Sequence, residues 1–281
     1  MIPFLLWNLI AVLYKLKCFI PIISSYYTPV EMHLSLRRVL NTFFYCSYTN
    51  GVFVVQNTSD LQSAYHPIDG PLWFVRELMT IVLISPIIIG GIKRLGSKFV
   101  LFLGLLWYFS NIIMPSLGYL TSLTTAAFFF SWGAYYSITN RNIVASFKSI
   151  NLRYLLIAYA IMAIIDVFTI DNFINIYIHN LGIVLGVLVV TNMTNILLCN
   201  NIAKVNPFLA NSSFFIFALH DLIIHDLGKM LLMILHVPDN PYIMLVFYFM
   251  IPIFTIIICI IIYRMLKSYM PSFCNLLTGS R

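Results

Sequence analysis

Residues 70–92 read GPLWFVRELMTIVLISPIIIGGI, a hydrophobic run of membrane-spanning length that carries Arg76 and Glu77 near its start. An arginine or acidic side chain at mid-depth in a bilayer costs about 2.5 to 3.5 kcal/mol on insertion scales. Such residues persist where they line a cavity, pair with one another or take part in chemistry. The alternative is that Arg76 extends to the headgroups with Glu77 beside it in water. Because neighbouring helical residues point about 100° apart, both can avoid lipid only inside a bundle.

The composition of the whole chain is that of a membrane protein. Its 281 residues are 61% hydrophobic and 9% charged, and the mean hydropathy is +0.93. Soluble domains have about 45–50% apolar and about 25% charged residues. A water-soluble core cannot bury this much apolar surface, so we predict a polytopic membrane protein with the lipid bilayer as its surroundings.

The apolar residues fall into segments of roughly the length that a spanning helix needs. The segments are 1–14, 71–92, 97–114, 119–138, 152–170, 173–193, 213–235 and 242–266. None shows the strict alternation of a barrel strand. We therefore predict an all-α, polytopic transmembrane helical bundle of about eight spanning helices, forming a single membrane-embedded domain over residues 1–281.

The charges between the segments predict the orientation. Among the short connections, basic residues occur only in alternate ones and in the tail, and they are Lys93, Arg94, Lys98, Arg141, Lys148, Arg153, Lys204, Arg264, Lys267 and Arg281; four more, Lys15, Lys17, Arg37 and Arg38, lie in the long connection 15–70. The other short connections lack lysine and arginine and include Asp171 and Asp239. The positive-inside rule then places both termini in the cytoplasm. The long connection 15–70 is a weak topology signal and would lie outside.

Neither the net charge nor the cysteines indicate another class of site. The net charge is +7, but the basic residues are scattered between apolar runs, so no nucleic-acid partner is expected. The five cysteines show no CxxC and no histidine at metal-ligand spacing. Cys18 and Cys46 can share the outer loop and form a disulfide, or all five can be small semi-buried thiols. We expect no metal.

A second group of polar residues follows the sequence SSFFIFALHD at 212–221. Asp221, His225 and Lys229 recur every four residues and predict one stripe along a helix. His220 lies about 100° away from Asp221 around the helix axis. An intramembrane histidine can accept a proton, bind a metal or form a packing hydrogen bond. No third ligand lies at a matching depth, so the sequence disfavours a metal and leaves the other two roles open.

Other polar residues in the apolar segments are typical of hydrogen bonds between helices. Asp166 and His179 lie on consecutive segments, 152–170 and 173–193, at depths where their side chains can meet. We predict that they pair and that they have a structural role.

Three stretches resemble acyltransferase family 3, the integral-membrane O-acyltransferases that modify bacterial surface sugars. They are LWFVRE at 72–77 with the downstream Pro86, SSFFIFALH at 212–220, and PFLLW at 3–7. Family members have ten helices with both termini cytoplasmic, so the resemblance implies an N-terminally truncated domain that lacks the first two helices. The family's catalytic histidine lies in that missing part, which implies that this chain is inactive as given.

The resemblance implies transfer of an acyl group, usually acetyl, from cytosolic acyl-CoA to a hydroxyl of a cell-surface or exported polysaccharide. It implies a location in the cytoplasmic (inner) membrane, with acyl-CoA as donor substrate and a saccharide as acceptor. Arg76 would stabilise negative charge or position the acceptor, Glu77 would orient Arg76, His220 would line a central cavity from the opposite side, and Trp73 would contact substrate. The alternatives are a transporter or flippase of a lipid-linked sugar, and a non-catalytic membrane remnant.

Overall fold

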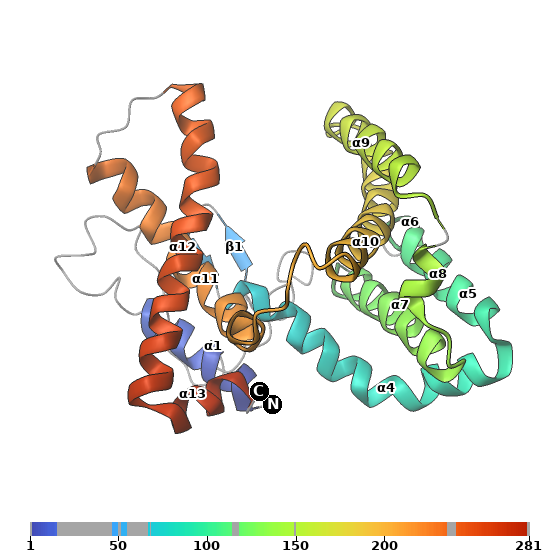
Figure 1. The fold of residues 1–281 in the computed structure, drawn as a ribbon, viewed down its shortest axis with the longest axis horizontal. Coiled ribbons are helices and arrows are strands. Elements are labelled where there is room, and N and C mark those ends of the chain that lie inside the picture. Colours follow the sequence, from blue (N-terminus) through green and yellow to red (C-terminus); the bar gives the residue numbers. More distant parts are fainter. Residues whose placement is uncertain are drawn as a thin grey trace. The chain divides into compact units, whose positions relative to one another are not determined.

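A computed structural model describes residues 2–15, 47–49, 52–54, 67, 69–113, 118–148, 150–234 and 240–279. These residues are helical apart from turns and a short hairpin. The chain divides into two compact units (Figure 1). The first comprises Met1–Thr80 and Asn206–Arg281, and the second comprises Ile81–Val205. Each unit is described separately below.

The first unit is built from helices at both ends of the chain and from the start of the run at 70–92. Its elements are α1 (Ile2–Lys15), η2 (Gly70–Leu72), the start of α4 (Trp73–Leu95), α11 (Pro207–Ile234), α12 (Pro241–Tyr269) and α13 (Pro271–Thr278). Strands β1 (Ser47–Thr49) and β2 (Val52–Val54) pair in antiparallel fashion.

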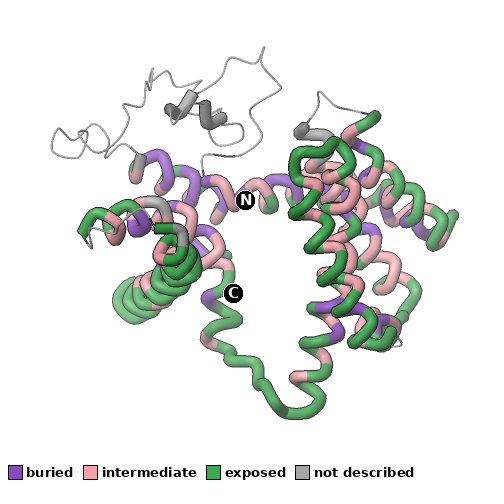
Figure 2. The backbone as a smooth tube through the Cα atoms, turned by 90° about the horizontal axis from the view of Figure 1, so that it is seen from above, coloured by how far each residue is buried: buried purple, intermediate pink, exposed green. Residues whose placement is uncertain are grey.

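Helix α1 owes its orientation to the spacing of its apolar residues. Phe4, Trp7, Ala11 and Val12 are buried, whereas Leu13, for example, is 58% exposed. The buried positions recur at three- and four-residue intervals and so form one face of the helix. Figure 2 shows buried residues alternating with exposed ones in this way along the helices.

The two ends of the described chain meet inside the first unit. Trp7 Nε1 on α1 donates a hydrogen bond to the carbonyl oxygen of Leu277 on α13, at 3.1 Å. The N and C labels lie close together in Figure 1. Both described ends therefore lie on the same side of this unit. That this side is cytoplasmic stays a prediction.

The second unit contains the rest of α4 and six further helices among the described residues. They are α5 (Ser97–Tyr108), α6 (Ser110–Ile113), α7 (Gly118–Ile138), α8 (Ile143–Lys148), α9 (Leu152–Phe168) and α10 (Asn175–Cys199). The buried cluster of this unit is aliphatic, and the partly buried rings of Phe128 and Trp132 pack against it. Trp107 stacks on Phe128 with centroids 5.1 Å apart, and Phe128 stacks on Trp132 at 5.6 Å. The stacking of Trp107 on Phe128 joins α5 to α7, whereas the pair of Phe128 and Trp132 lies within α7.

Helix α4 passes through Pro86 without a break, although proline has no N–H to donate to the carbonyl of Val82 one turn earlier. Ser85 Oγ donates to that carbonyl oxygen at 2.8 Å. A hydroxyl therefore satisfies the group that the proline leaves open, which is a common solution in membrane helices.

Each of the eight predicted segments contains a helix, but the prediction of about eight spans is not confirmed. Among the described residues, four helices are long and apolar enough to cross a membrane, and they are Gly70–Leu95, Asn175–Cys199, Pro207–Ile224 and Tyr242–Tyr269. Several apolar helices thus indicate a membrane-embedded, multi-pass protein.

The helices in the other four segments do not meet the length or hydrophobicity that a membrane span needs. Helices α1, α5 and α9 have 14, 12 and 17 residues. These correspond to about 21, 18 and 26 Å, against a hydrocarbon core of about 30 Å. Helix α7 has 21 residues, but its threonine, serine and tyrosine side chains make it less apolar. Hydrophobic runs in the sequence included flanking turn residues that the helices exclude.

Two adjacent glycines in α4 allow a matched test of its packing against α5. A Cβ added at Gly90 has nothing within 4 Å, so Gly90→Ala should raise the free energy of unfolding by about 0.5–1 kcal/mol. A Cβ at Gly91 would lie 2.5 Å from Cζ of Phe99, so Gly91→Ala should lower it by about 1–3 kcal/mol. Unfolding of both variants in the same lipid or detergent measures the difference. Equal effects would contradict the contact between Gly91 and Phe99.

Candidate functional site

The three stretches that carry the family resemblance come together in the first unit. Trp7 of α1, Leu72 of η2 and Phe215 of α11 belong to one buried cluster, which Tyr263 of α12 and Leu277 of α13 complete. The Trp7 and Phe215 rings meet edge to face with centroids 5.2 Å apart. Segments that lie far apart in the sequence thus form one core.

Arg76 and Glu77 are buried on the inner face at the start of α4, with side chains 4% and 0% exposed. Arg76 Nη2 donates to Glu77 Oε1 at 2.7 Å. The arginine therefore does not extend to the headgroups, and the pair lies where only the helical bundle can shelter both side chains. A buried ion pair loses its hydration, and its desolvation cost rivals its Coulombic gain. Stability alone is therefore weak grounds for keeping such a pair.

A corner at residues 69–70, at the start of the turn that leads into α4, joins three elements. Asn8 of α1 is fully buried; its Oδ1 accepts a hydrogen bond from the Asp69 N–H at 3.4 Å, and its Nδ2 donates to the Phe4 carbonyl at 2.8 Å. The Asp221 carboxylate of α11 approaches Gly70 so closely that a Cβ there would lie 3.2 Å from Oδ2. Gly70 thus allows α11 to approach the start of α4.

Asn8 and Asp69 are site residues that the sequence analysis did not identify. Asp69 is fully buried and occupies the position before the 3-10 turn that leads into α4, without a side-chain capping hydrogen bond. The sequence does contain weak signals: Asn8 follows Trp7 on the buried face of α1, and Asp69 precedes Gly-Pro, a common helix start. Neither signal separates a buried polar residue from a loop residue.

His220 lies partly buried on α11, one residue before Asp221. Its Nδ1 lies 2.8 Å from the carbonyl oxygen of Phe217 and 3.2 Å from that of Ile216. These contacts fix the imidazole against its own helix. The central cavity that we expected beside it stays a prediction.

The predicted stripe of Asp221, His225 and Lys229 does not share one environment. Asp221 faces the corner at Gly70, whereas Lys229 is exposed. The His225 side chain lies outside the described residues. Asp226, which we had not placed on the stripe, accepts a hydrogen bond from the Tyr14 hydroxyl of α1. Helix α11 is therefore held to α1 on one side and to η2 on another.

Trp73 is half-buried at the first position of α4, and its ring meets that of exposed Phe74 edge to face at 6.2 Å. It is three residues from Arg76, or about one helical turn. Its substrate contact stays a prediction.

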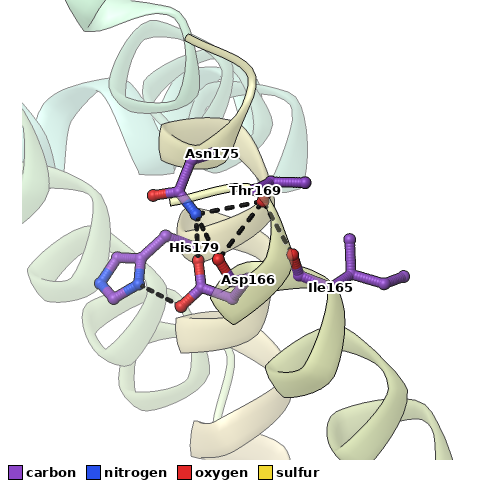
Figure 3. A network of polar contacts seen from close by, with 5 residues as sticks. All are labelled: Ile165, Asp166, Thr169, Asn175 and His179. Atoms are coloured by element: carbon purple, nitrogen blue, oxygen red, sulfur yellow. Dashed lines mark hydrogen bonds and ion pairs between the residues drawn. The ribbon is translucent and has the colours of Figure 1, made fainter. Parts of the chain in front are cut away.

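The predicted pair of Asp166 and His179 is confirmed in the second unit. His179 Nδ1 lies 3.1 Å from Asp166 Oδ2 (Figure 3), and the side chains are 58% and 32% exposed. Asn175 Nδ2 donates to Asp166 Oδ1 at 2.9 Å and to the Asp166 carbonyl oxygen at 2.7 Å. The network ties the start of α10 to the end of α9, which accounts for it without chemistry.

Loss of the His179 side chain should therefore have little effect on stability. We expect His179→Ala to lower the free energy of unfolding by about 0.2–1 kcal/mol, because a solvent-exposed ion pair contributes that much. Denaturant titration of the purified protein measures this. A loss of several kcal/mol would show instead that the network is buried in the assembled protein.

The metal and disulfide predictions concern the cysteine, histidine and carboxylate side chains. Among the described residues there is no group of three or more histidine, cysteine, aspartate or glutamate side chains that could hold a metal. Cys18 and Cys46 lie outside the described residues, so their disulfide stays a prediction. Cys199 is exposed, and Cys274 of α13 is buried. Burial raises the pKa of the Cys274 thiol, against the opposing effect of Lys267, so the neutral thiol persists there.

Comparisons with known proteins identify no relative of this chain. The chain matches no family model, and neither curated proteins nor solved structures give a significant match.

Proposed function

We propose that the chain is a membrane-embedded O-acyltransferase that moves an acyl group, usually acetyl, from cytosolic acyl-CoA to a hydroxyl of a cell-surface or exported polysaccharide. The observation that supports this proposal is the buried Arg76–Glu77 pair, which follows by one turn the Leu72 that shares a buried cluster with Trp7 and Phe215. Three stretches that resemble acyltransferase family 3 are thus neighbours in space. A chance resemblance gives no reason for them to pack together.

The reaction requires a positive charge that is held in place away from water. Attack of a hydroxyl on a thioester carbonyl forms a tetrahedral oxyanion, and fixed donors are most effective in a site of low dielectric. Arg76 would supply N–H donors to this oxyanion or to the acceptor. Glu77, 2.7 Å from Nη2, would hold the guanidinium in one orientation. Trp73, one turn before Arg76, would contact the sugar.

The test compares surface polysaccharide from cells with and without the gene, by mass spectrometry. Deletion should remove the mass of acetyl groups from the repeating unit, and the gene should restore it. Complementation is done with the chain from Met1 and, separately, with all in-frame coding sequence upstream of it. Restoration by the longer form alone would show that coding sequence upstream of Met1 supplies a needed group.

An unchanged acyl pattern would contradict the proposal. Accumulation of a lipid-linked sugar on the cytoplasmic side after deletion, with its covalent structure unchanged, would favour the transporter or flippase. No change in either quantity would favour the non-catalytic membrane remnant.

A further inference from the structure

The place where α12 leads into α13 combines exposed basic and exposed apolar side chains. Arg264 and Lys267 are both exposed and lie about one turn apart on α12. Lys267 Nζ lies 5.5 Å from the ring centroid of buried Tyr263, which holds it at this end of the helix. The exposed apolar side chains that follow are Tyr269, Met270, Phe273 and Leu276. We call these six exposed residues the α12–α13 turn.

The length of α12 indicates where this turn lies in a membrane. The apolar helix Tyr242–Tyr269 has 28 residues, or about 42 Å, against a hydrocarbon core of about 30 Å. Arg264 lies about 33 Å along the axis from Tyr242, so it extends past the hydrocarbon when the rest of the helix crosses it. Tyr242 and Tyr269 are both exposed, which is typical of tyrosines at the two membrane–water interfaces.

Helix α13 has three different sides, because successive residues point about 100° apart. The buried side, which packs within the unit, consists of Cys274, Leu277 and Thr278. Phe273 and Leu276 form an exposed apolar side next to it. Ser272 and Asn275 form the remaining side, which is exposed and polar. A helix with one apolar and one polar exposed side is suited to the boundary between lipid and water.

The charge around the turn is of one sign. Residues 1–15 and 240–281, which include α1, α12 and α13, contain no aspartate or glutamate. Helix α11 meets this end of α12 near its own start, where the rings of Phe208 and Tyr263 are 5.5 Å apart. Its first acidic residue, Asp221, lies about 20 Å farther along α11. Neither Arg264 nor Lys267 forms an ion pair within the part of the chain that the structure describes.

We propose that the α12–α13 turn binds the phosphate headgroups of anionic phospholipids. Arg264 and Lys267 contact the phosphate, and Phe273 and Leu276 contact the first methylene groups of the acyl chains. Basic residues at a membrane surface attract anionic lipids in this way. A soluble phosphate compound would match the two cations but would leave the adjacent apolar side chains in water. The inference does not depend on the proposed acyl transfer.

The test is thermal unfolding of the purified full chain in an uncharged detergent, with added phosphatidylglycerol. Phosphatidylcholine with the same acyl chains is the lipid control. We expect phosphatidylglycerol to raise the unfolding temperature and phosphatidylcholine to have little effect. The double substitution Arg264→Gln, Lys267→Gln should weaken the apparent affinity for phosphatidylglycerol about 25-fold, since each basic residue near an anionic surface contributes a factor of about five. An unchanged affinity would overturn the proposal.

The matched control is Lys93→Gln, Arg94→Gln, which removes two exposed charges from the last turn of α4 in the other unit. This variant should keep the affinity for phosphatidylglycerol. An equal loss in both double variants would show a general effect of positive charge and would overturn a site at the α12–α13 turn.

Two further measurements separate a lipid from a soluble phosphate. Phe273→Ser should weaken the effect of phosphatidylglycerol while leaving the unfolding temperature without lipid unchanged, because the side chain is exposed. Inorganic phosphate and coenzyme A should not raise the unfolding temperature through Arg264 and Lys267. If either does so as strongly as phosphatidylglycerol, the site takes a soluble phosphate and the proposal is wrong. Native mass spectrometry, which counts the phosphatidylglycerol molecules bound to each variant, should show fewer on Arg264→Gln, Lys267→Gln; an equal number would overturn the proposal.

Discussion

Glu77→Ala is expected to lower the free energy of unfolding by about 3–5 kcal/mol, because the buried guanidinium of Arg76 would lose the carboxylate that now lies 2.7 Å away. Arg76→Ala should cost a similar amount by leaving the Glu77 charge in the same surroundings. Both side chains are at most 4% exposed, so water cannot replace the missing charge without disturbing the packing.

The double substitution Arg76→Leu, Glu77→Leu provides the control. Replacement of a whole buried ion pair by apolar residues is often neutral or stabilising by about 1–4 kcal/mol. We therefore expect the double variant to be more stable than either single variant and to lack acyl transfer. Equilibrium unfolding in detergent and acyl transfer in membranes measure the two properties. Retained transfer in the stable double variant would remove the pair from the catalytic site.

Trp7→Ala is expected to lower the free energy of unfolding by a similar amount, about 3–5 kcal/mol, because a large side chain that is 1% exposed would leave a cavity. It would also remove the edge-to-face contact with Phe215 and the hydrogen bond to the Leu277 carbonyl. Trp7→Phe keeps most of the ring volume and loses only that hydrogen bond, so about 1–3 kcal/mol is expected.

Leu13→Ala on the same helix is the matched control. Leu13 is 58% exposed, so its truncation should change stability much less than Trp7→Ala. Unfolding midpoints of the three variants under one set of conditions give the comparison. Equal losses for Trp7→Ala and Leu13→Ala would contradict the core in which α1 joins α11 and α13.

Sequence reasoning succeeded where local chemistry dictates the outcome. Every apolar segment contains a helix, because a chain in lipid must satisfy its backbone hydrogen bonds within each segment. Asp166 and His179 could be paired because they lie on consecutive helices joined by a short turn, which limits where each side chain can be. The predicted count of about eight spans is not confirmed, because hydrophobicity does not mark where a helix ends.

The sequence identified some residues of the candidate site and missed others. Arg76, Glu77 and His220 stood out because polar residues are costly in an apolar segment. Asn8 and Asp69 did not, because their burial depends on α1 and the start of α4 meeting across a long stretch of sequence. The orientation of His220 also depends on a side-chain rotamer, which no residue pattern specifies.

The sequence by itself thus determined the class of the protein, its helices and the polar residues that needed an explanation. Composition and periodicity act within one segment, and each of these features is a property of one segment. Only the tertiary structure decided that Trp7, Leu72 and Phe215 share a core, and that Arg76 and Glu77 pair away from lipid. Those outcomes depend on which helix faces pack against each other. Many pairings of faces bury a similar apolar area. The shapes of the side chains and the hydrogen bonds of buried polar groups therefore select one pairing.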